Sequence, residues 1–140
     1  MSAREELARA LIPVAHVMRV PPVVANPSDP AADVVRRIIA EDVGSVIVVS
    51  DEEIPFGIVT ERDVLEHFST FGAIRDDLRV KDVMSTPIVS IEANRPLRDA
   101  LRTMRDNKVR RLAVTLHGKL IGQVTERRLL DALLFISDLD

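Results

Sequence analysis

The chain contains 140 residues, of which 46% are hydrophobic and 29% are charged, and its net charge is −3. These totals are typical of a folded globular domain and provide no general basic field for nucleic acid. Cysteine is absent, which excludes disulfides, thiolate chemistry and cysteine-ligated zinc. No apolar run approaches the roughly 18 residues of a membrane span. The N-terminus carries two glutamates and no apolar core segment, so it does not fit a signal peptide. We therefore expect a cytoplasmic protein with no membrane partner.

The first predicted element is a short helix within residues 1–13. Ser2 and Glu5 have the spacing of a capping box, and Leu7, Ala10 and Leu11 form a short apolar edge. This helix precedes a longer pattern that occurs twice, so we treat it as a separate element.

Residues 14–70 have the pattern of one β-α-β-β-α unit. A short extended run at 23–25 is followed by a helix that opens at Asp29-Pro30, because proline suits the first turn of a helix. The apolar positions of this helix follow helical spacing: Val34, Val35, Ile38 and Ile39. Two further strands are predicted at 46–49 and 56–59, with a turn between them. A closing helix begins at Thr60.

The same order of elements returns after a linker at residues 71–79, so the chain contains an internal repeat. Residues 80–84 match 14–18, and residues 122–130 match 57–65, at an offset of 65 or 66 residues. The second unit, residues 80–140, has predicted strands at 88–91, 112–115 and 120–124 and predicted helices at 96–107 and from Thr125. One such unit buries little core alone. We therefore predict an α+β fold in which the two units pack sheet against sheet with pseudo-two-fold symmetry.

Each repeat ends in a nearly identical string, GIVTERD at residues 57–63 and GQVTERR at residues 122–128. One explanation is structural, because Thr60 can cap the closing helix and Asp63, three residues later, can complete a capping box. The other is functional. A helix N-terminus favours an anion, and a carboxylate can accept hydrogen bonds from ribose hydroxyls. The two roles are compatible, and the residues alone leave both open.

The Val-Met pair followed by Pro and Val, the order of elements and Gly-x-Val-Thr-x-x-Asp together resemble a CBS domain. Two in tandem resemble a stand-alone CBS pair, or Bateman module, over residues 14–135. The resemblance implies an adenosine ligand in the cleft between the two units, with its ribose on Thr60 and Asp63 and its adenine against residues 86–89. The full implied site comprises Ile58, Thr60, Asp63, Pro87, Ile88, Val89, Val109, Arg110 and Arg111.

Arg110 and Arg111 suit the phosphate end of such a ligand, because a guanidinium can hold a phosphate with two hydrogen bonds. An exposed pair of surface charges is the simpler explanation of the same dipeptide. The mirror-image site has no arginine pair and no carboxylate for the ribose. It would use Val23, Val24, Gly44, Ser45, Thr125 and Arg128. We therefore expect one nucleotide per chain and a weak or empty second site.

The remaining polar residues do not form the motifs of a metal, phosphate-loop or catalytic site. The three histidines, His16, His67 and His117, lack metal-ligand spacing. A phosphate-loop motif and a nucleophile–base pair are also absent. We therefore expect no metal, no cofactor and no catalysis. The predicted function is a regulatory sensor of adenine nucleotides (AMP first, then ADP or ATP) in energy sensing. A ligand-free dimerisation or scaffold module and an S-adenosylmethionine binder are the alternatives, and an enzyme or a nucleic-acid binder ranks below them.

The two closing helices are unusually apolar. The first carries Val64, Leu65, Phe68 and Phe71, and the second carries Leu129, Leu130, Leu133, Leu134, Phe135 and Ile136, with Leu139 beyond. Burial within the chain would explain them, and so would a partner surface. Because closing helices pair modules in CBS pairs, the resemblance implies a two-fold homodimer. The resemblance also implies an unknown protein target that the module regulates.

Overall fold

The computed structural model of the protein describes residues 2–4, 11–41 and 43–138, with side chains as far as Leu134. Most of the helix predicted near the N-terminus lies outside these residues. Within them, no helix is long and apolar enough to cross a membrane.

The described residues form two compact units. We call residues Pro22–Ile88 the Asp63 unit, and we call the segment up to Pro21 together with the residues from Val89 onward the Arg128 unit. Each unit contains one three-stranded sheet and the predicted β-α-β-β-α order. The α+β class is therefore confirmed.

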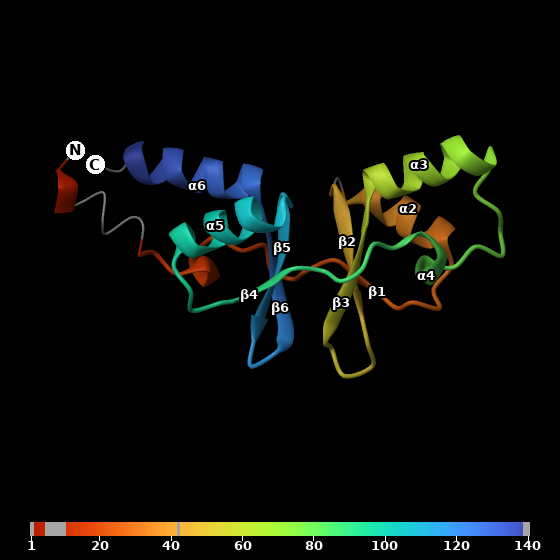
Figure 1. Ribbon diagram of the computed structural model, residues 1–140, viewed down its shortest axis with the longest axis horizontal. Helices are drawn as coiled ribbons and strands as arrows, with labels where there is room; N and C mark the ends of the chain where they lie inside the picture. The colour runs from red at the N-terminus through yellow and green to blue at the C-terminus, as the bar shows by residue number, and fades with distance from the viewer. Residues whose placement is uncertain (1, 5–10, 42, 139–140) are drawn as a thin grey trace. The chain divides into compact units, whose positions relative to one another are not determined.

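In the Asp63 unit, the central strand of the sheet pairs in parallel with the first strand and antiparallel with the third. The strands are β1 (Val24–Ala25), β2 (Ser45–Val49) and β3 (Pro55–Thr60). The helices are α2 (Ala31–Ala40), α3 (Glu61–Phe71) and the short α4 (Val80–Val83). Figure 1 shows these helices together on one side of their sheet.

The Arg128 unit repeats this arrangement, again with its two long helices on one side of the sheet (Figure 1). Its strands are β4 (Ser90–Glu92), β5 (Arg111–Leu116) and β6 (Lys119–Thr125). Its helices are the 3-10 turn η1 (Val14–His16), α5 (Leu97–Asn107) and α6 (Glu126–Asp138).

Proline begins the first long helix of each unit, as predicted, because its missing N–H is not needed there. Pro30 is the N-cap of α2 and Pro96 is the N-cap of α5. The apolar spacing also holds, since α2 buries Val34 and Ile38. Ile39, which the spacing predicts on the same stripe, is instead 75% exposed.

Each unit has its own hydrophobic core, and each core includes a valine from the other sequence repeat. Val80 is fully buried in the core of the Asp63 unit, and its N–H donates to the carbonyl of Asp29 at 2.9 Å. Val14 is fully buried in the core of the Arg128 unit, and its N–H donates to the carbonyl of Arg95 at 2.8 Å. The compact units therefore differ from the sequence repeats in the segments that contain these two valines.

One predicted strand boundary was wrong. The expected strand at 88–91 begins only at Ser90, and the N–H of Ile88 instead donates to the carbonyl of Phe56 at 3.1 Å. The closing helix α3 runs through Phe71 and ends at Gly72, whose φ of 74° is left-handed. Glycine adopts this conformation without a steric penalty, so it stops the helix there.

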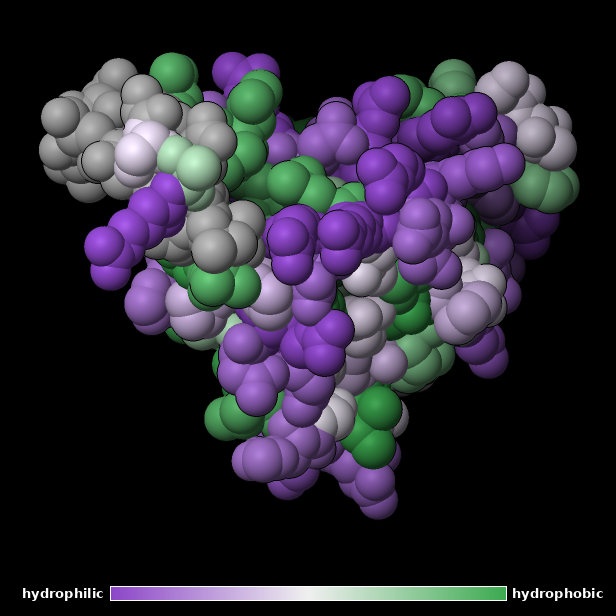
Figure 2. All heavy atoms as spheres, turned by 60° about the vertical axis from the view of Figure 1, so that its left-hand side comes forward, coloured by the Kyte–Doolittle hydropathy of each residue, from purple (hydrophilic) through white to green (hydrophobic). Residues whose placement is uncertain are grey.

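The closing helices expose much of their apolar surface. Helix α3 buries no residue, and Leu65, Phe68 and Phe71 are 67%, 53% and 67% exposed. On α6, Leu129 is buried, whereas Leu130 and Leu134 are 60% and 64% exposed. Figure 2 shows hydrophobic patches among hydrophilic atoms on the side that carries α5 and α6. Burial within the chain therefore does not explain these five residues.

Candidate functional site

Thr60 and Asp63 form the capping box that their spacing predicts. Thr60 is the N-cap of α3, and its Oγ1 accepts a hydrogen bond from the N–H of Asp63 at 3.1 Å. In return, Oδ2 of Asp63 accepts from the N–H of Thr60 at 2.8 Å. These two bonds satisfy backbone donors that the first turn of a helix leaves without partners.

The other oxygen of Asp63 has a partner that the sequence did not identify. The hydroxyl of Ser85 donates to Oδ1 at 2.9 Å. Ser85 is held at this place by a two-way backbone bridge to Ile58 on β3, with N···O distances of 3.0 and 2.8 Å. The segment that follows α4 therefore lies directly beside the start of α3.

The Arg128 unit repeats the threonine cap, but the side chain three residues later is positively charged. Oγ1 of Thr125 accepts from the N–H of Arg128 at 3.0 Å, as in a normal N-cap. The guanidinium of Arg128 donates from Nε to the carbonyl of Val17 and from a terminal nitrogen to the carbonyl of Met18 at 3.3 Å. Arg128 thus ties α6 to the segment after η1, just as Asp63 ties α3 to the segment after α4.

The glycine of each repeated string permits this close approach. A Cβ on Gly57 would lie 3.0 Å from Sδ of Met84 and 3.2 Å from the carbonyl oxygen of Ser85. A Cβ on Gly122 would lie 2.6 Å from Sδ of Met18 and 3.0 Å from the carbonyl oxygen of Arg19. Real Cβ atoms essentially never approach another atom as closely as the Met18 contact, so Gly122 has the tighter fit. The Gly and Met positions of the repeat are therefore coupled by packing.

The predicted nucleotide-site residues fall into two groups. Ile58, Thr60, Asp63, Pro87 and Ile88 belong to the Asp63 unit. There the Ser85 bridge links β3 to the segment that holds Pro87 and Ile88. The other predicted residues, Val89, Val109, Arg110 and Arg111, belong to the Arg128 unit.

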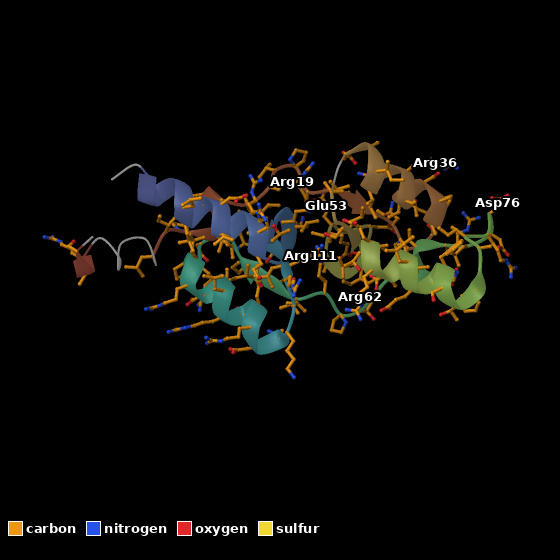
Figure 3. The ribbon with its side chains drawn as sticks, turned by 90° about the horizontal axis from the view of Figure 1, so that it is seen from above. Arg19, Arg36, Glu53, Arg62, Asp76 and Arg111 are labelled. Atoms are coloured by element: carbon orange, nitrogen blue, oxygen red, sulfur yellow. The ribbon has the colours of Figure 1, made fainter. Side chains whose placement is uncertain are left out.

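In the Arg128 unit, the arginine pair lies where α5 leads into β5, and Figure 3 labels Arg111 there. Arg110 is exposed, and its carbonyl accepts from the first N–H of α6, that of Glu126, at 2.9 Å. Arg111 is half-buried, and its Nε is buried with no hydrogen-bond partner among the described residues. Because buried donors are normally paired, Arg111 does not fit the description of an ordinary surface charge.

The strand register brings together residues that were predicted for different sites. Ser45 lies opposite Thr60 in the Asp63 unit, and Arg111 lies opposite Thr125 in the Arg128 unit. Ser45 is 3% exposed, so its side chain is buried. The remaining residues of the predicted second site, Val23, Val24 and Gly44, also lie in the Asp63 unit.

Two residues with a clear structural role were missed. Ser85 could have been found from the repeat, because Ser85 is replaced by Arg19 in the copy where Asp63 is replaced by Arg128. Glu92 gave no comparable signal. Its carboxylate accepts from the hydroxyl of Thr115 and from the N–H of His117 at 2.9 Å. The Thr115 hydroxyl lowers the pKa of Glu92, burial opposes this, and the N–H of His117 adds to the lowering.

No group of three or more metal-ligating side chains occurs in the part of the chain that the structure describes. His67 is half-buried and lies beside the ring of Phe71, with 4.6 Å between the ring centroids.

Comparisons with known proteins agree on one family. The model of the CBS domain matches residues 14–70 and 80–135. An uncharacterized protein of Methanopyrus kandleri is 31% identical over 120 residues, which are 85% of this chain and 61% of that protein. The chain thus spans about three fifths of this relative's length.

Solved structures give the same result. A CBS domain structure matches with a TM-score of 0.78 and 25% identity, over 87% of this chain and 98% of that one. The structure of CBSX2 in complex with AMP matches with a TM-score of 0.74 and 27% identity, over 89% of this chain and 98% of that one. With both repeats matched, the chain belongs to the CBS domain family as a tandem pair.

Proposed function

We propose that this protein is a regulatory module that binds an adenine nucleotide, with AMP as the leading ligand. In this proposal Thr60 and Asp63 hold the ribose, and Arg110 and Arg111 hold the phosphate. Binding would then change the affinity of the module for a protein target, as in any linked equilibrium.

The observation that carries the proposal is the state of the Asp63 carboxylate. Its two oxygens provide about four acceptor positions, and the described residues use two of them, for the N–H of Thr60 and the hydroxyl of Ser85. The carboxylate is therefore fixed in place and can still accept two more donors. A ribose offers two neighbouring hydroxyls, which is the number required.

The phosphate role rests on Arg111. Its Nε is buried without a partner among the described residues, and such a donor gains more from an anionic acceptor than a solvated one does. The AMP bound to CBSX2, a relative of 27% identity, supports the choice of ligand class.

The test is a ligand panel followed by two matched variants. AMP, ADP, ATP, GMP and S-adenosylmethionine are compared by thermal shift, where a ligand at 100 times its Kd stabilises by about 2.7 kcal/mol. Asp63→Ala should abolish the AMP shift. Asp82→Ala should keep it, because Asp82 is also a capping carboxylate, bonded to the N–H of Arg79 at 2.9 Å, but lies in α4. Loss of the shift in both variants, or in neither, would contradict the proposed role of Asp63.

A second candidate function is a scaffold without a ligand. It is favoured by the capping box itself, because the bonds of Asp63 to Thr60 and Ser85 already give the carboxylate a structural purpose. On this view Asp63→Ala lowers the free energy of unfolding by about 1 kcal/mol. No nucleotide in the panel then shifts the melting temperature of the wild type or of Asp63→Ala.

We also propose that the module forms a homodimer through its closing helices. The exposed apolar side chains of α3 and α6 are the supporting observation, since monomeric proteins rarely expose such patches together. A CBS-CP12 protein with 25% identity is hexameric, which supports the proposal that this module assembles. Light scattering should give a dimer mass for the wild type and a monomer mass for Phe68→Glu. A monomer mass for the wild type would refute the proposal.

A further inference from the structure

Ser85 holds the second oxygen of the Asp63 carboxylate, although a helix cap does not require such a bond. The same type of cap occurs at α4, where Oδ2 of Asp82 accepts from the N–H of Arg79 at 2.9 Å. Among the described residues, no side chain donates to the other oxygen of Asp82. The hydroxyl of Ser85 therefore gives Asp63 a second anchor that the cap of α4 does without.

The side chain of Ser85 is also not needed to hold its own segment in place. The N–H and the carbonyl of Ser85 both bond to the backbone of Ile58, at 2.8 and 3.0 Å, and every residue except proline has these two groups. Arg19, the match of Ser85 in the other repeat, makes the same bridge to Gln123 at 2.7 and 3.2 Å with a different side chain. The backbone bridge therefore does not depend on the serine hydroxyl, which bonds to Asp63 instead.

Both donors that contact the Asp63 carboxylate are already used by it. The N–H of Thr60 bonds to Oδ2, and the hydroxyl of Ser85, which has a single proton, bonds to Oδ1. The open positions at this place are therefore acceptors, on the two carboxylate oxygens and on the oxygen of Ser85. A ligand with two neighbouring hydroxyls, a diol, can donate to them, whereas an anionic oxygen brought to the same place is repelled by the carboxylate.

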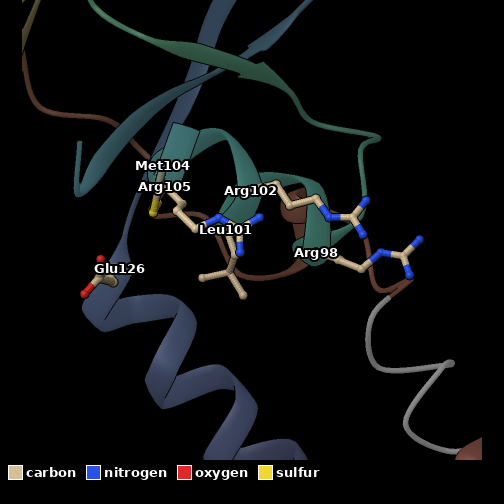
Figure 4. Close-up of a pocket in the computed structure, with 6 residues that line it drawn as sticks. All are labelled: Arg98, Leu101, Arg102, Met104, Arg105 and Glu126. Atoms are coloured by element: carbon tan, nitrogen blue, oxygen red, sulfur yellow. The ribbon is translucent and has the colours of Figure 1, made fainter. Parts of the chain in front are cut away.

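The hollow between α5 and the start of α6 offers a diol no such arrangement. Its volume is about 560 Å³, and six residues line it: Arg98, Leu101, Arg102, Met104, Arg105 and Glu126. The guanidinium groups only donate hydrogen bonds, and Figure 4 shows Glu126 at the other end of the hollow from Arg98. No described residue bonds to the carboxylate of Glu126, so this carboxylate is not held in one orientation as that of Asp63 is.

We propose that Ser85 is a positioning residue that makes the Asp63 site selective for ligands with a free diol. The proposal rests on the nucleotide function proposed above, and it narrows the ligand class to ribonucleotides whose 2′- and 3′-hydroxyls are both unsubstituted. Because Thr60 and Ser85 hold one carboxylate oxygen each, the orientation of the carboxylate is fixed before the sugar binds. A 2′-deoxynucleotide then donates one bond in place of two, and a 3′-phosphate places an anion against the carboxylate.

The experiment is isothermal titration of AMP, 2′-deoxy-AMP and adenosine 3′,5′-bisphosphate into the full chain. All three ligands carry adenine and a 5′-phosphate, so they differ only at the hydroxyls that Asp63 is proposed to hold. The protein variants are Ser85→Ala, which removes the hydroxyl, and Ser85→Thr, which keeps it. Ser50→Ala is the matched control, because the Ser50 hydroxyl accepts from the N–H groups of Glu52 and Ile54 at 3.3 Å each, in the turn before β3. Thermal unfolding confirms that each variant folds.

We expect the wild type to bind AMP about tenfold or more tightly than 2′-deoxy-AMP, because a site built for a hydroxyl discriminates against its loss. The bisphosphate should bind more weakly than AMP as well. Ser85→Ala should lower the ratio of the AMP and 2′-deoxy-AMP affinities by about threefold or more, the effect of one hydrogen bond. Ser85→Thr and Ser50→Ala should keep the wild-type ratio.

Two results would overturn this inference and leave the nucleotide function in place. The first is equal affinity of the wild type for AMP and 2′-deoxy-AMP, which would refute the selectivity for a diol. The second is an unchanged ratio in Ser85→Ala, since a purely structural role of Ser85 would weaken both ligands equally. Failure of AMP itself to bind the wild type would instead overturn the nucleotide function and this inference together.

Discussion

The starts of α3 and α6 use one backbone design with opposite side-chain chemistry. In both, a threonine caps the helix, and the side chain three positions later contacts a Val-Met pair or the residue directly after it. At α3 this residue is Asp63, which accepts from the hydroxyl of Ser85. At α6 it is Arg128, which donates to the carbonyls of Val17 and Met18.

The difference teaches that the two repeats can carry side chains of opposite charge at the same position, because neighbouring groups supply the hydrogen-bond partners that each needs. A carboxylate needs donors, and Ser85 supplies one. A guanidinium needs acceptors, and backbone carbonyls supply them wherever the chain comes close enough. The Asp-to-Arg change therefore keeps the helix attached while it removes the one group in that position that can accept hydrogen bonds from a sugar.

The largest expected effect is on the close packing that both helix starts share. Gly122→Ala should destabilise the protein by about 1–3 kcal/mol, because the new methyl meets the backbone of Arg19 as well as Met18. Gly57→Ala should cost less, since the corresponding contacts are longer, 3.0 Å to Sδ of Met84 and 3.2 Å to the carbonyl oxygen of Ser85. Urea unfolding measures both. A larger loss of stability in Gly57→Ala than in Gly122→Ala would contradict the tighter fit at Gly122.

A smaller effect is expected from removing the side chains that attach the helices. Arg128→Ala should cost about 1 kcal/mol, because hydrogen bonds to charged groups are the stronger kind but this side chain is exposed. Ser85→Ala should cost less than that, because it removes one hydroxyl from a carboxylate that retains its bond to Thr60. Thermal unfolding of the two variants gives the order, and the reverse order would contradict it.

A pH-dependent difference between the units follows from Glu92. The Thr115 hydroxyl holds the pKa of Glu92 below its ordinary value in the folded protein. The ionised carboxylate therefore stabilises the fold above the unfolded pKa, and this stabilisation is lost as pH falls through the folded pKa. Glu92→Gln should therefore be less stable than the wild type at neutral pH, and the difference in free energy of unfolding between the two should disappear at acidic pH. The Asp63 unit has Asn26 at this position, and Asn26→Gln is the control that should show no such closing. A gap for Glu92→Gln that stays constant down to acidic pH would contradict this.

Local patterns predicted the elements well, and the reason is physical. Apolar spacing, prolines at helix starts and the Thr-x-x-Asp cap all act within a few residues, so they are visible in the sequence. The packing of Val14 and Val80 was not predictable in this way. Each valine belongs to one sequence repeat but packs in the core formed mainly by the other. No residue close to either valine in the sequence specifies this long-range packing.

The candidate site shows the same division. The capping box was predicted from spacing, whereas the bond from Ser85 to Asp63 joins residues that are 22 positions apart. Likewise, the sequence predicted a phosphate role for Arg111, and it gave no sign that the Nε of this residue would be buried and unpaired among the described residues.

Isothermal titration of AMP into the wild-type chain tests the asymmetry between Asp63 and Arg128 most directly. A single carboxylate able to hold a ribose predicts one AMP per chain, lost in Asp63→Ala and retained in Arg128→Ala. Two sites of equal affinity per chain, or binding that survives Asp63→Ala unchanged, would contradict the assignment of the nucleotide to Asp63.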